Sequence, residues 1–224
     1  MTGHFFVIDG PDGAGKGTQI RMLKDTLLHR YGRPPEDFVF TREPGGSPFA
    51  EEIRKLILSP RARDASASVM VQLFGAARFD HLEQTIVPAL AKGKVVISDR
   101  FASATYAYQV VAQDGGKATW DLLETQNTLI KNFDGFSTKR CTTIILEVSA
   151  EIGMNRSAVR KGQTRTHFDA RDIAFQQAVH KGFGVCNNPF GHTVWVDGSR
   201  TPALVHHDII EIFDRVLGGP SPLS

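Results

Sequence analysis

A glycine-rich stretch that ends in a lysine is the clearest chemical signal in this sequence of 224 residues. It runs from Gly10 to Thr18 as GPDGAGKGT and follows the apolar residues 5–8. Glycines let a backbone wrap closely around phosphate oxygens, while consecutive N–H groups and a helix N-terminus supply positive potential. Lys16 adds a positive charge on a flexible side chain. The pattern therefore predicts a strand, a phosphate-binding loop and the start of a helix.

One position of this loop departs from the usual phosphate-binding pattern. Gly17 occupies the place where serine or threonine usually binds Mg²⁺, and Thr18 follows it. The missing hydroxyl argues against a GTPase, because GTPases use that group on the metal. We therefore expect Mg²⁺ to be held mainly by phosphates, by water and by carboxylates such as Asp9 and Asp99.

A charged pair, Asp99 and Arg100, directly follows the predicted strand 94–98. An isolated Asp-Arg pair could equally be a structural ion pair. In open α/β sheets, however, ligands bind at the carboxyl ends of the strands, where the glycine-rich loop also lies. A planar guanidinium binds phosphate through two parallel hydrogen bonds. We expect Arg100 to hold the acceptor or the transferring phosphoryl group, and Asp99 to order the water shell of the metal.

Two residues on a predicted helix could bind a base. Phe74 and Arg78 are four residues apart and therefore share a helix face. An aromatic ring and a guanidinium on one face can stack on a base and hydrogen-bond to it, although core packing is the usual role of a phenylalanine. Arg54 follows a proline-glycine turn, and a solvated surface charge is its ordinary interpretation.

The elements that must position these residues alternate between strands and helices. We expect strands at 4–9, 38–40, 94–98, 142–148 and 193–196. We expect helices at about 16–31, 48–58, 65–91, 103–113, 118–132, 171–183 and 202–217. This alternation predicts an α/β protein with the three-layer P-loop fold, in which a parallel sheet of about five strands carries helices on both faces.

The domain organisation is predicted to be simple. We expect residues 1–217 to form a single domain, a short basic and flexible lid at about 150–170, and a flexible tail at 218–224. No internal repeat or linker divides the chain.

Composition excludes several classes of partner. The 26 basic and 24 acidic residues give a formal charge of +2, which is too small to indicate a nucleic-acid surface. No apolar run approaches the roughly 20 residues of a membrane span. Cys141 and Cys186 have no paired spacing, so we expect two buried thiols in a reducing compartment. We therefore expect a cytoplasmic protein that binds neither nucleic acid nor membrane.

The chain resembles the thymidylate kinases, the P-loop enzymes that phosphorylate dTMP. Segments in the expected order and spacing carry the resemblance: residues 9–19, the TREPGG run at 41–46, Leu73 and Phe74 with Arg78, and 98–101 leading to 107–109. The resemblance implies ATP-dependent, Mg²⁺-assisted conversion of dTMP to dTDP by direct in-line transfer, for dTTP synthesis, in a homodimer. Two alternatives stay open: a kinase for another pyrimidine monophosphate (dUMP, UMP or CMP), or a non-catalytic nucleotide-binding switch.

The resemblance also implies roles for individual residues. ATP would bind to Gly10, Pro11, Asp12, Gly13, Ala14, Gly15, Lys16, Gly17 and Thr18. Phe74 would stack on the thymine, while Arg78 and Gln109 would read its edge, with Thr105 nearby. Arg54 and Arg100 would hold the monophosphate. Asp9 would lie near the sugar hydroxyl and the metal, Tyr108 would wall the 2′ side of the sugar, and Pro44 would follow a cis peptide bond in the substrate site.

Catalysis should rest on Asp9, Lys16, Arg100 and a cation from the lid. The phosphate-binding loop has Asp12, Gly13 and Ala14 where some relatives of this family place an arginine, so the lid must supply that cation. Arg165 is the favoured candidate and Arg156 the next, while Arg160 and His167 remain alternatives. An ordinary solvated helix face is the competing interpretation. A further departure is Ala104, which stands where the family commonly has serine.

Overall fold

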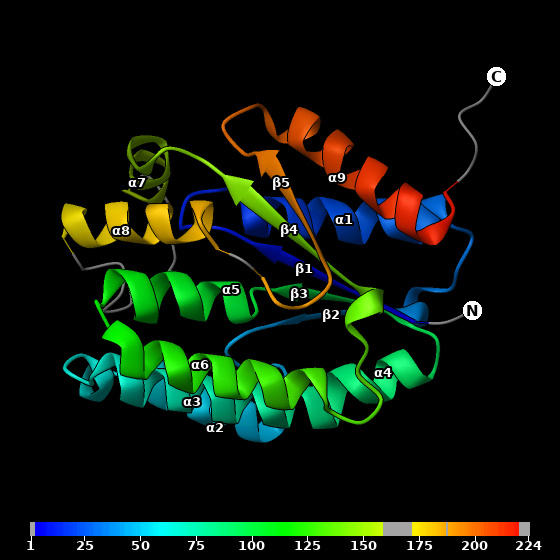
Figure 1. Ribbon diagram of the computed structural model, residues 1–224. Coiled ribbons are helices and arrows are strands. Elements are labelled where there is room, and N and C mark those ends of the chain that lie inside the picture. Colours follow the sequence, from blue (N-terminus) through cyan, green and yellow to red (C-terminus); the bar gives the residue numbers. More distant parts are fainter. Residues whose placement is uncertain (1–2, 159–171, 187, 220–224) are drawn as a thin grey trace.

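The fold is built on one parallel sheet. A computed structural model describes residues 3–158, 172–186 and 188–219 (Figure 1). Its strands are β1 (His4–Asp9), β2 (Phe38–Arg42), β3 (Val95–Asp99), β4 (Cys141–Glu147) and β5 (His192–Asp197). They pair in the order β2-β3-β1-β4-β5, and every pairing is parallel. The predicted five-stranded α/β fold is therefore confirmed.

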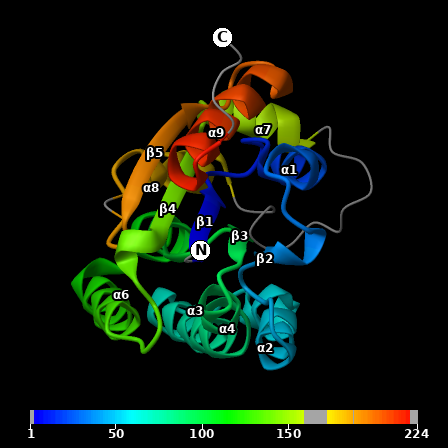
Figure 2. The same ribbon diagram turned by 90° about the vertical axis from the view of Figure 1, so that its right-hand side faces the viewer.

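Helices cover both faces of the sheet. Figures 1 and 2 show α1 (Lys16–Arg30) and α9 (Pro202–Leu217) on one face. The opposite face carries α2 (Pro48–Leu58), α3 (Ala67–His81), α4 (Val87–Ala91) and α6 (Gly116–Lys131). The remaining α-helices are α5 (Ala102–Thr105), α7 (Ala150–Ala158) and α8 (Ile173–Gly184). Single 3₁₀ turns lie at Pro35–Asp37, Pro60–Ala62 and Thr138–Arg140.

The central strand β1 explains why the sheet is covered on both sides. Phe6 and Ile8 pack with α1 and α9, whereas Phe5 and Val7 pack into the cluster on the other face. All four side chains are fully buried. A strand that is apolar at every position cannot leave either face in water, because exposing each side chain would cost about 1.5–3 kcal/mol. This burial holds the carboxyl end of β1, and so the loop that follows it, in place.

Two expected helices contain a wider turn. The helix predicted at 65–91 consists of α3, a π-helical segment at Leu82–Ile86, and α4. Pro88 has no N–H to donate, which accounts for a break in the α-helical hydrogen-bond ladder at this point. The helix predicted at 103–113 consists of α5 and a π-helical segment at Tyr106–Ala112. Such segments are common at functional sites, and this one contains Tyr108 and Gln109.

The predicted lid begins as ordered helix. A flexible lid is predicted at about 150–170, and the part of it that the structure describes, residues 150–158, forms α7. Residues 159–171 lie outside the described part of the chain. Among the described helices, none is both long and apolar enough to cross a membrane.

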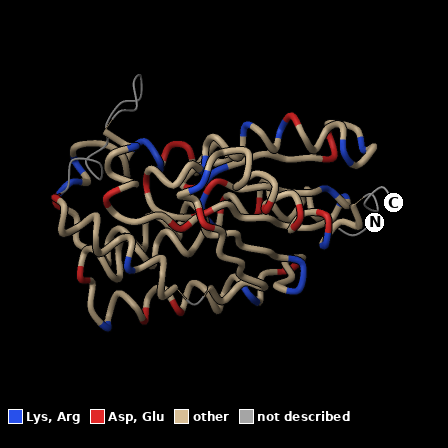
Figure 3. The backbone as a smooth tube through the Cα atoms, turned by 90° about the horizontal axis from the view of Figure 1, so that it is seen from above, with Lys and Arg blue, Asp and Glu red and all other residues tan. Residues whose placement is uncertain are grey.

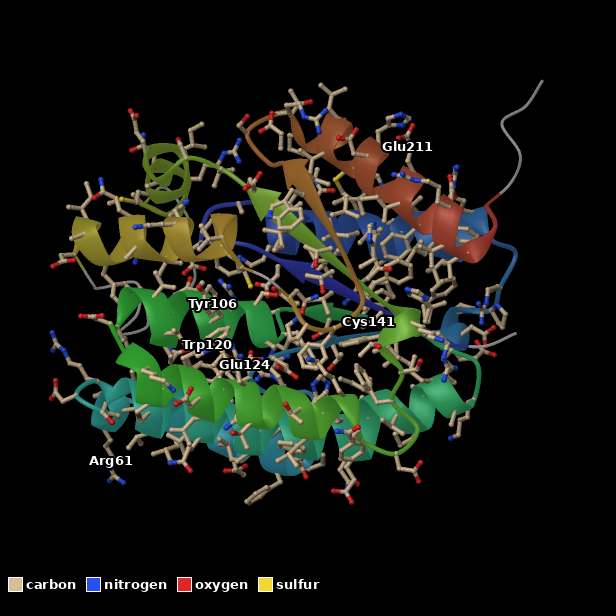
Figure 4. All side chains as sticks on the ribbon, viewed as in Figure 1. Arg61, Tyr106, Trp120, Glu124, Cys141 and Glu211 are labelled. Atoms are coloured by element: carbon tan, nitrogen blue, oxygen red, sulfur yellow. The ribbon has the colours of Figure 1, made fainter. Side chains whose placement is uncertain are left out.

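Charged residues of both signs are interspersed along the described chain (Figure 3), and both cysteines are buried. Figure 3 shows Lys and Arg interspersed with Asp and Glu along the described trace. Cys141 and Cys186 are both buried free thiols, and burial raises the pKa of each to about 12. Figure 4 labels Cys141 at the start of β4. Figure 4 also labels Tyr106 of the π-helical segment and Trp120 of α6, whose rings pack edge to face with their centroids 5.3 Å apart.

The contact between β1 and α9 gives the first prediction. The rings of Phe6 and Phe213 stack with centroids 3.8 Å apart, and both are fully buried. Replacing Phe213 with alanine should lower the free energy of unfolding by about 3–5 kcal/mol, because it removes buried surface and leaves a cavity. Leu204→Ala on the same helix is the matched control, since Leu204 is 52% exposed and its replacement should change stability by no more than about 0.5 kcal/mol. Urea denaturation measures both, and equal losses would contradict this account of the core.

Candidate active site

The phosphate-binding loop connects β1 to α1. Gly13 has φ +79°, and a Cβ added there would lie 2.0 Å from the carbonyl oxygen of Gly153 in α7. Only glycine fits this close approach between the loop and α7. Lys16 is buried and donates from Nζ to the carbonyl oxygens of Gly10 at 2.9 Å and Pro11 at 2.8 Å. Burial and the nearby positive charge of Arg100 lower the pKa of Lys16 to about 8.

Asp9 ends β1 and lies beneath the loop. Its Oδ1 accepts a hydrogen bond from the backbone N–H of Gly10 at 2.9 Å, and its Oδ2 accepts one from the N–H of Phe101 at 3.3 Å. The side chain is fully buried, 3.5 Å from Nη1 of Arg100. Burial raises the pKa of Asp9 to about 6, against the opposing attraction of Arg100 and Lys16. Both oxygens therefore hold backbone in place at the junction of β1 and β3.

Arg100 joins the loop to the other half of the site. It follows β3 with φ +73°, a left-handed conformation that few non-glycine residues adopt. Its Nη1 donates to the carbonyl oxygen of Gly10 at 3.0 Å, and its Nη2 donates to Oδ1 of Asp12 at 2.7 Å. The hydroxyl of Tyr108 donates to Oδ2 of Asp12 at 2.6 Å and lies 3.4 Å from Nη2 of Arg100. One guanidinium thus contacts the loop and Tyr108 together.

The side chain of Asp12 contacts residues outside the loop, which its position in the sequence does not predict. Asp12 is predicted to belong to the ATP-binding loop, and its carboxylate faces Arg100 and Tyr108. Burial opposes the charge on Arg100, yet Tyr108 and Asp12 outweigh it and raise the pKa of Arg100 above its ordinary value. Arg100 is accordingly a permanent cation at the junction.

Arg78 and Gln109 each present one unpartnered polar atom. Arg78 is 1% exposed and donates from Nε to Oε2 of Glu43 and from Nη2 to Oγ1 of Thr105, both at 2.8 Å. Its Nη1 is buried without a hydrogen-bond partner among the described residues. Gln109 donates from Nε2 to Gln113 at 3.3 Å, while its buried Oε1 also lacks a partner in the described part of the chain. Buried polar atoms are usually paired, so these two atoms are available to hydrogen-bond a ligand.

The remaining predicted substrate residues lie around this region. The Glu43–Pro44 bond is cis, as expected, and Arg54 donates from Nη1 to the carbonyl oxygen of Pro44 at 2.6 Å. Arg54 is therefore not a free surface charge. Its electrostatic neighbours include Asp99 and Arg100, and burial lowers its pKa. Phe74 is only partly buried, and it packs against the cluster that contains Met70 and Tyr108.

Of the four candidate lid cations, only Arg156 belongs to the described part of the chain. It donates from Nη1 to the carbonyl oxygen of Gly198 at 2.7 Å and from Nη2 to that of Ser199 at 2.9 Å. It thus ties α7 to the loop after β5, where a Cβ on Gly198 would lie 3.0 Å from the carbonyl oxygen of Ala14. Arg165, the favoured lid cation, and its alternatives Arg160 and His167 lie outside the described residues.

Sequence reasoning missed two residues of the site. Glu43 and His81 are buried, and the carboxylate of Glu43 contacts both Arg78 and His81. Glu43 lies within the TREPGG run, which was the only signal available for it. His81 lies three residues after Arg78, a spacing that places both on one face of α3.

The raised pKa of Asp9 gives a prediction about stability. Because the pKa in the folded chain, about 6, exceeds the ordinary value of 3.8, the folded protein holds a proton that the unfolded chain has lost. The stability that this proton contributes is full below pH 3.8 and disappears as the pH rises through 6. Asp9→Asn, which cannot titrate, should therefore gain stability relative to the wild type, by about 2 kcal/mol between pH 4 and pH 7. Urea denaturation without nucleotide, in EDTA, measures the difference, and a difference independent of pH would contradict the assignment.

Comparison with known proteins agrees with this geometry. Residues 8–209 match the family model for thymidylate kinase. The thymidylate kinase of Ruegeria pomeroyi is 39% identical over 212 residues, which cover 94% of both chains. That of Ectopseudomonas mendocina is 36% identical, over 97% of this chain and 98% of the relative. The crystal structure of thymidylate kinase from Ehrlichia chaffeensis superposes with a TM-score of 0.69 and 28% identity, over 96% of this chain and 99% of that one. The chain therefore belongs to the thymidylate kinase family.

Proposed function

We propose that this protein transfers the γ-phosphoryl group of ATP to dTMP, giving dTDP and ADP by direct in-line displacement. Family membership carries the reaction type. The observation that carries the assignment of the site is the position of Arg100, whose guanidinium contacts the phosphate-binding loop and Tyr108 at once. In-line transfer needs both nucleotides aligned on one cation-rich junction, because the protein contributes positioning and charge rather than covalent chemistry.

The donor half is assigned to the loop from Gly10 to Thr18. Backbone N–H groups, the N-terminus of α1 and the Lys16 ammonium would bind the phosphates of ATP. In the described structure Lys16 is bonded to two loop carbonyl oxygens, so it would exchange these bonds for phosphate oxygens when ATP binds.

Two carboxylates fit a water-mediated Mg²⁺ site beside the loop. Asp99 has a buried Oδ1 without a partner among the described residues, and Asp9 lies on the neighbouring strand end. The described residues contain no group of three or more His, Cys, Asp or Glu side chains that could hold a metal alone. Asp9 and Asp99 would therefore hold Mg²⁺ through water, with ATP phosphates as direct ligands. The bound ion would neutralise charge on the phosphates.

In the proposed dTMP site, the direction of the hydrogen bonds discriminates between bases. Nη1 of Arg78 can only donate, and Oε1 of Gln109 can only accept. Thymine offers a carbonyl acceptor at C4 beside an N3–H donor, which complements this pair. Cytosine offers an amino donor and a bare N3 acceptor, which would oppose both atoms. We accordingly assign Arg78 and Gln109 to the base edge, with Phe74 stacking on the ring and Thr105 orienting Arg78.

The phosphate and sugar of dTMP would occupy the space between this base pocket and the loop. Arg100 and Arg54 would bind the monophosphate, and Tyr108 would lie beside the sugar. Arg100 would then exchange its bond to Asp12 for phosphate oxygens. Asp9 would act through the loop and the water shell of the metal; its contact with the sugar hydroxyl stays a prediction.

Two features of the chain support a homodimer in a reducing compartment. The large apolar side chains of Phe49 and Leu56 on α2 and Val69 on α3 are 63%, 44% and 47% exposed. We propose that this face of α2 and α3 pairs with a second copy, which sedimentation measures. The two buried free thiols suit a cytoplasmic location.

A panel of acceptors tests the proposed reaction. With ATP and Mg²⁺, we expect turnover of dTMP to exceed that of UMP, CMP and AMP in a coupled assay for ADP. Discrimination against dUMP should be weaker, because one methyl group in an apolar pocket contributes only about 1–3 kcal/mol. ATP binding without turnover of any acceptor would support the nucleotide-dependent switch instead, and faster turnover of UMP or CMP would support a different pyrimidine kinase.

The lid cation gives a separate prediction. Arg165→Ala should lower kcat by at least about 100-fold while changing the Kd for dTMP little, because this cation would stabilise charge that develops only during transfer. Arg156→Ala is the comparison, since Arg156 already binds the carbonyl oxygens of Gly198 and Ser199. Unchanged turnover in Arg165→Ala, with a large loss in Arg156→Ala, would move the catalytic role to Arg156.

A further inference from the structure

A chain of buried hydrogen bonds runs from the end of β2 to Arg78. Oγ1 of Thr41 lies 2.7 Å from Nε2 of His81, and Nδ1 of His81 lies 3.1 Å from Oε1 of Glu43. The other oxygen of Glu43 accepts from Nε of Arg78 at 2.8 Å. The exposed fractions of Glu43, Arg78 and His81 are 5%, 1% and 0%. These three side chains are therefore shielded from water, whereas Thr41 is only partly buried, and Nη1 of Arg78 is buried without a partner among the described residues.

The direction of each bond follows from its chemistry. A carboxylate can only accept, so Nδ1 of His81 must carry a proton and donate it to Glu43. In the neutral imidazole Nε2 is then an acceptor, and the Thr41 hydroxyl donates to it. Thr41 thus fixes the tautomer, His81 orients the carboxylate, and the carboxylate orients the guanidinium. Thr105 fixes the guanidinium from the other side.

The surrounding loop is fitted closely to this chain. A Cβ added to Gly46, which has φ +88°, would lie 2.4 Å from both Nε2 of His81 and Oγ1 of Thr41. Thr85 donates to the carbonyl oxygen of Gly46 at 2.8 Å. Gly46 therefore packs directly against the contact between Thr41 and His81, and a side chain at position 46 would disturb that contact.

We propose that His81 is a positioning residue for base selection: through Glu43 it aims the free Nη1 of Arg78 at the carbonyl oxygen of the pyrimidine. This inference rests on the proposed role of Arg78 in reading the base. Glu43 provides the charge that keeps Arg78 buried, whereas His81 provides the direction. Removing the hydrogen bond between Thr41 and His81 should therefore impair recognition of the base while leaving ATP binding unchanged.

Two substitutions of His81 separate the two hydrogen bonds. The amide of His81→Asn can replace Nδ1 and donate to Glu43, whereas the longer amide of His81→Gln can replace Nε2 and contact Thr41. We expect His81→Gln to raise KM for dTMP about tenfold and to lower the ratio of kcat/KM for dTMP over dCMP about tenfold. We expect His81→Asn to stay within about threefold of the wild type in both quantities, and KM for ATP to change less than about twofold in either variant.

Two further variants keep the test decisive. His206→Gln is the matched control, because Nε2 of His206 makes the same kind of bond to Oγ1 of Thr26, 2.8 Å away, on the opposite face of the sheet. His206→Gln should leave unchanged the ratio of kcat/KM for dTMP over dCMP, the KM for dTMP and the KM for ATP. If His81→Gln fails to fold, Thr41→Val removes the same hydrogen bond from the other partner and keeps the side-chain volume. It should also lower the ratio of kcat/KM for dTMP over dCMP.

A double-mutant cycle with Arg78→Met distinguishes this inference from the proposed function. If His81 acts through Arg78, His81→Gln should reduce the dTMP/dCMP ratio no further once Arg78 is gone. The same additional loss in both backgrounds, or an unchanged ratio in His81→Gln and Thr41→Val, would overturn the role of His81. A normal ratio in Arg78→Met itself would instead overturn the assignment of Arg78 to the base.

Discussion

The guanidinium of Arg100 is the contact on which the rest of the site depends. It reaches a carbonyl oxygen and the Asp12 carboxylate of the phosphate-binding loop, and it lies beside the ring of Tyr108. It holds this position because β3 pairs with β1 and the backbone then turns through a left-handed residue. Opposite charges this close inside a protein attract each other strongly. Arg100 therefore fixes the positions of the phosphate-binding loop, the end of β3 and Tyr108 relative to one another.

In the proposed function, separate groups bind the phosphate and select the base. Arg100 and Arg54 lie toward the loop and the cis peptide, whereas Arg78 and Gln109 present a donor and an acceptor that lack described partners. A cation binds the phosphate of any nucleotide, so it cannot choose the base. Directional, buried hydrogen-bonding atoms can, because a mismatched base would leave them unpaired. We assign the Glu43 and His81 pair to this second, proposed function.

The sequence predicted what depends on local pattern and missed what depends on distant contacts. The β1 strand, the loop and α1 follow from consecutive residues, and the parallel sheet follows from the alternation of elements. The π-helical segments were missed because an apolar face continues through them with nearly helical spacing. Glu43 is 38 residues from His81, and Arg156 is 42 residues from Gly198, so no local spacing could reveal either contact. For the same reason Arg54 looked like a solvated charge, although it binds the carbonyl oxygen of Pro44.

The most direct test of Arg100 as the acceptor-phosphate residue compares two ligands that differ only in the phosphate. Calorimetry would give the Kd of dTMP and of thymidine for the wild type and for Arg100→Met. The account predicts that the variant weakens dTMP binding by about 100-fold, the size expected for lost charge-assisted hydrogen bonds, while thymidine binding changes less than about twofold. Equal losses for both ligands, or unchanged dTMP binding, would contradict it.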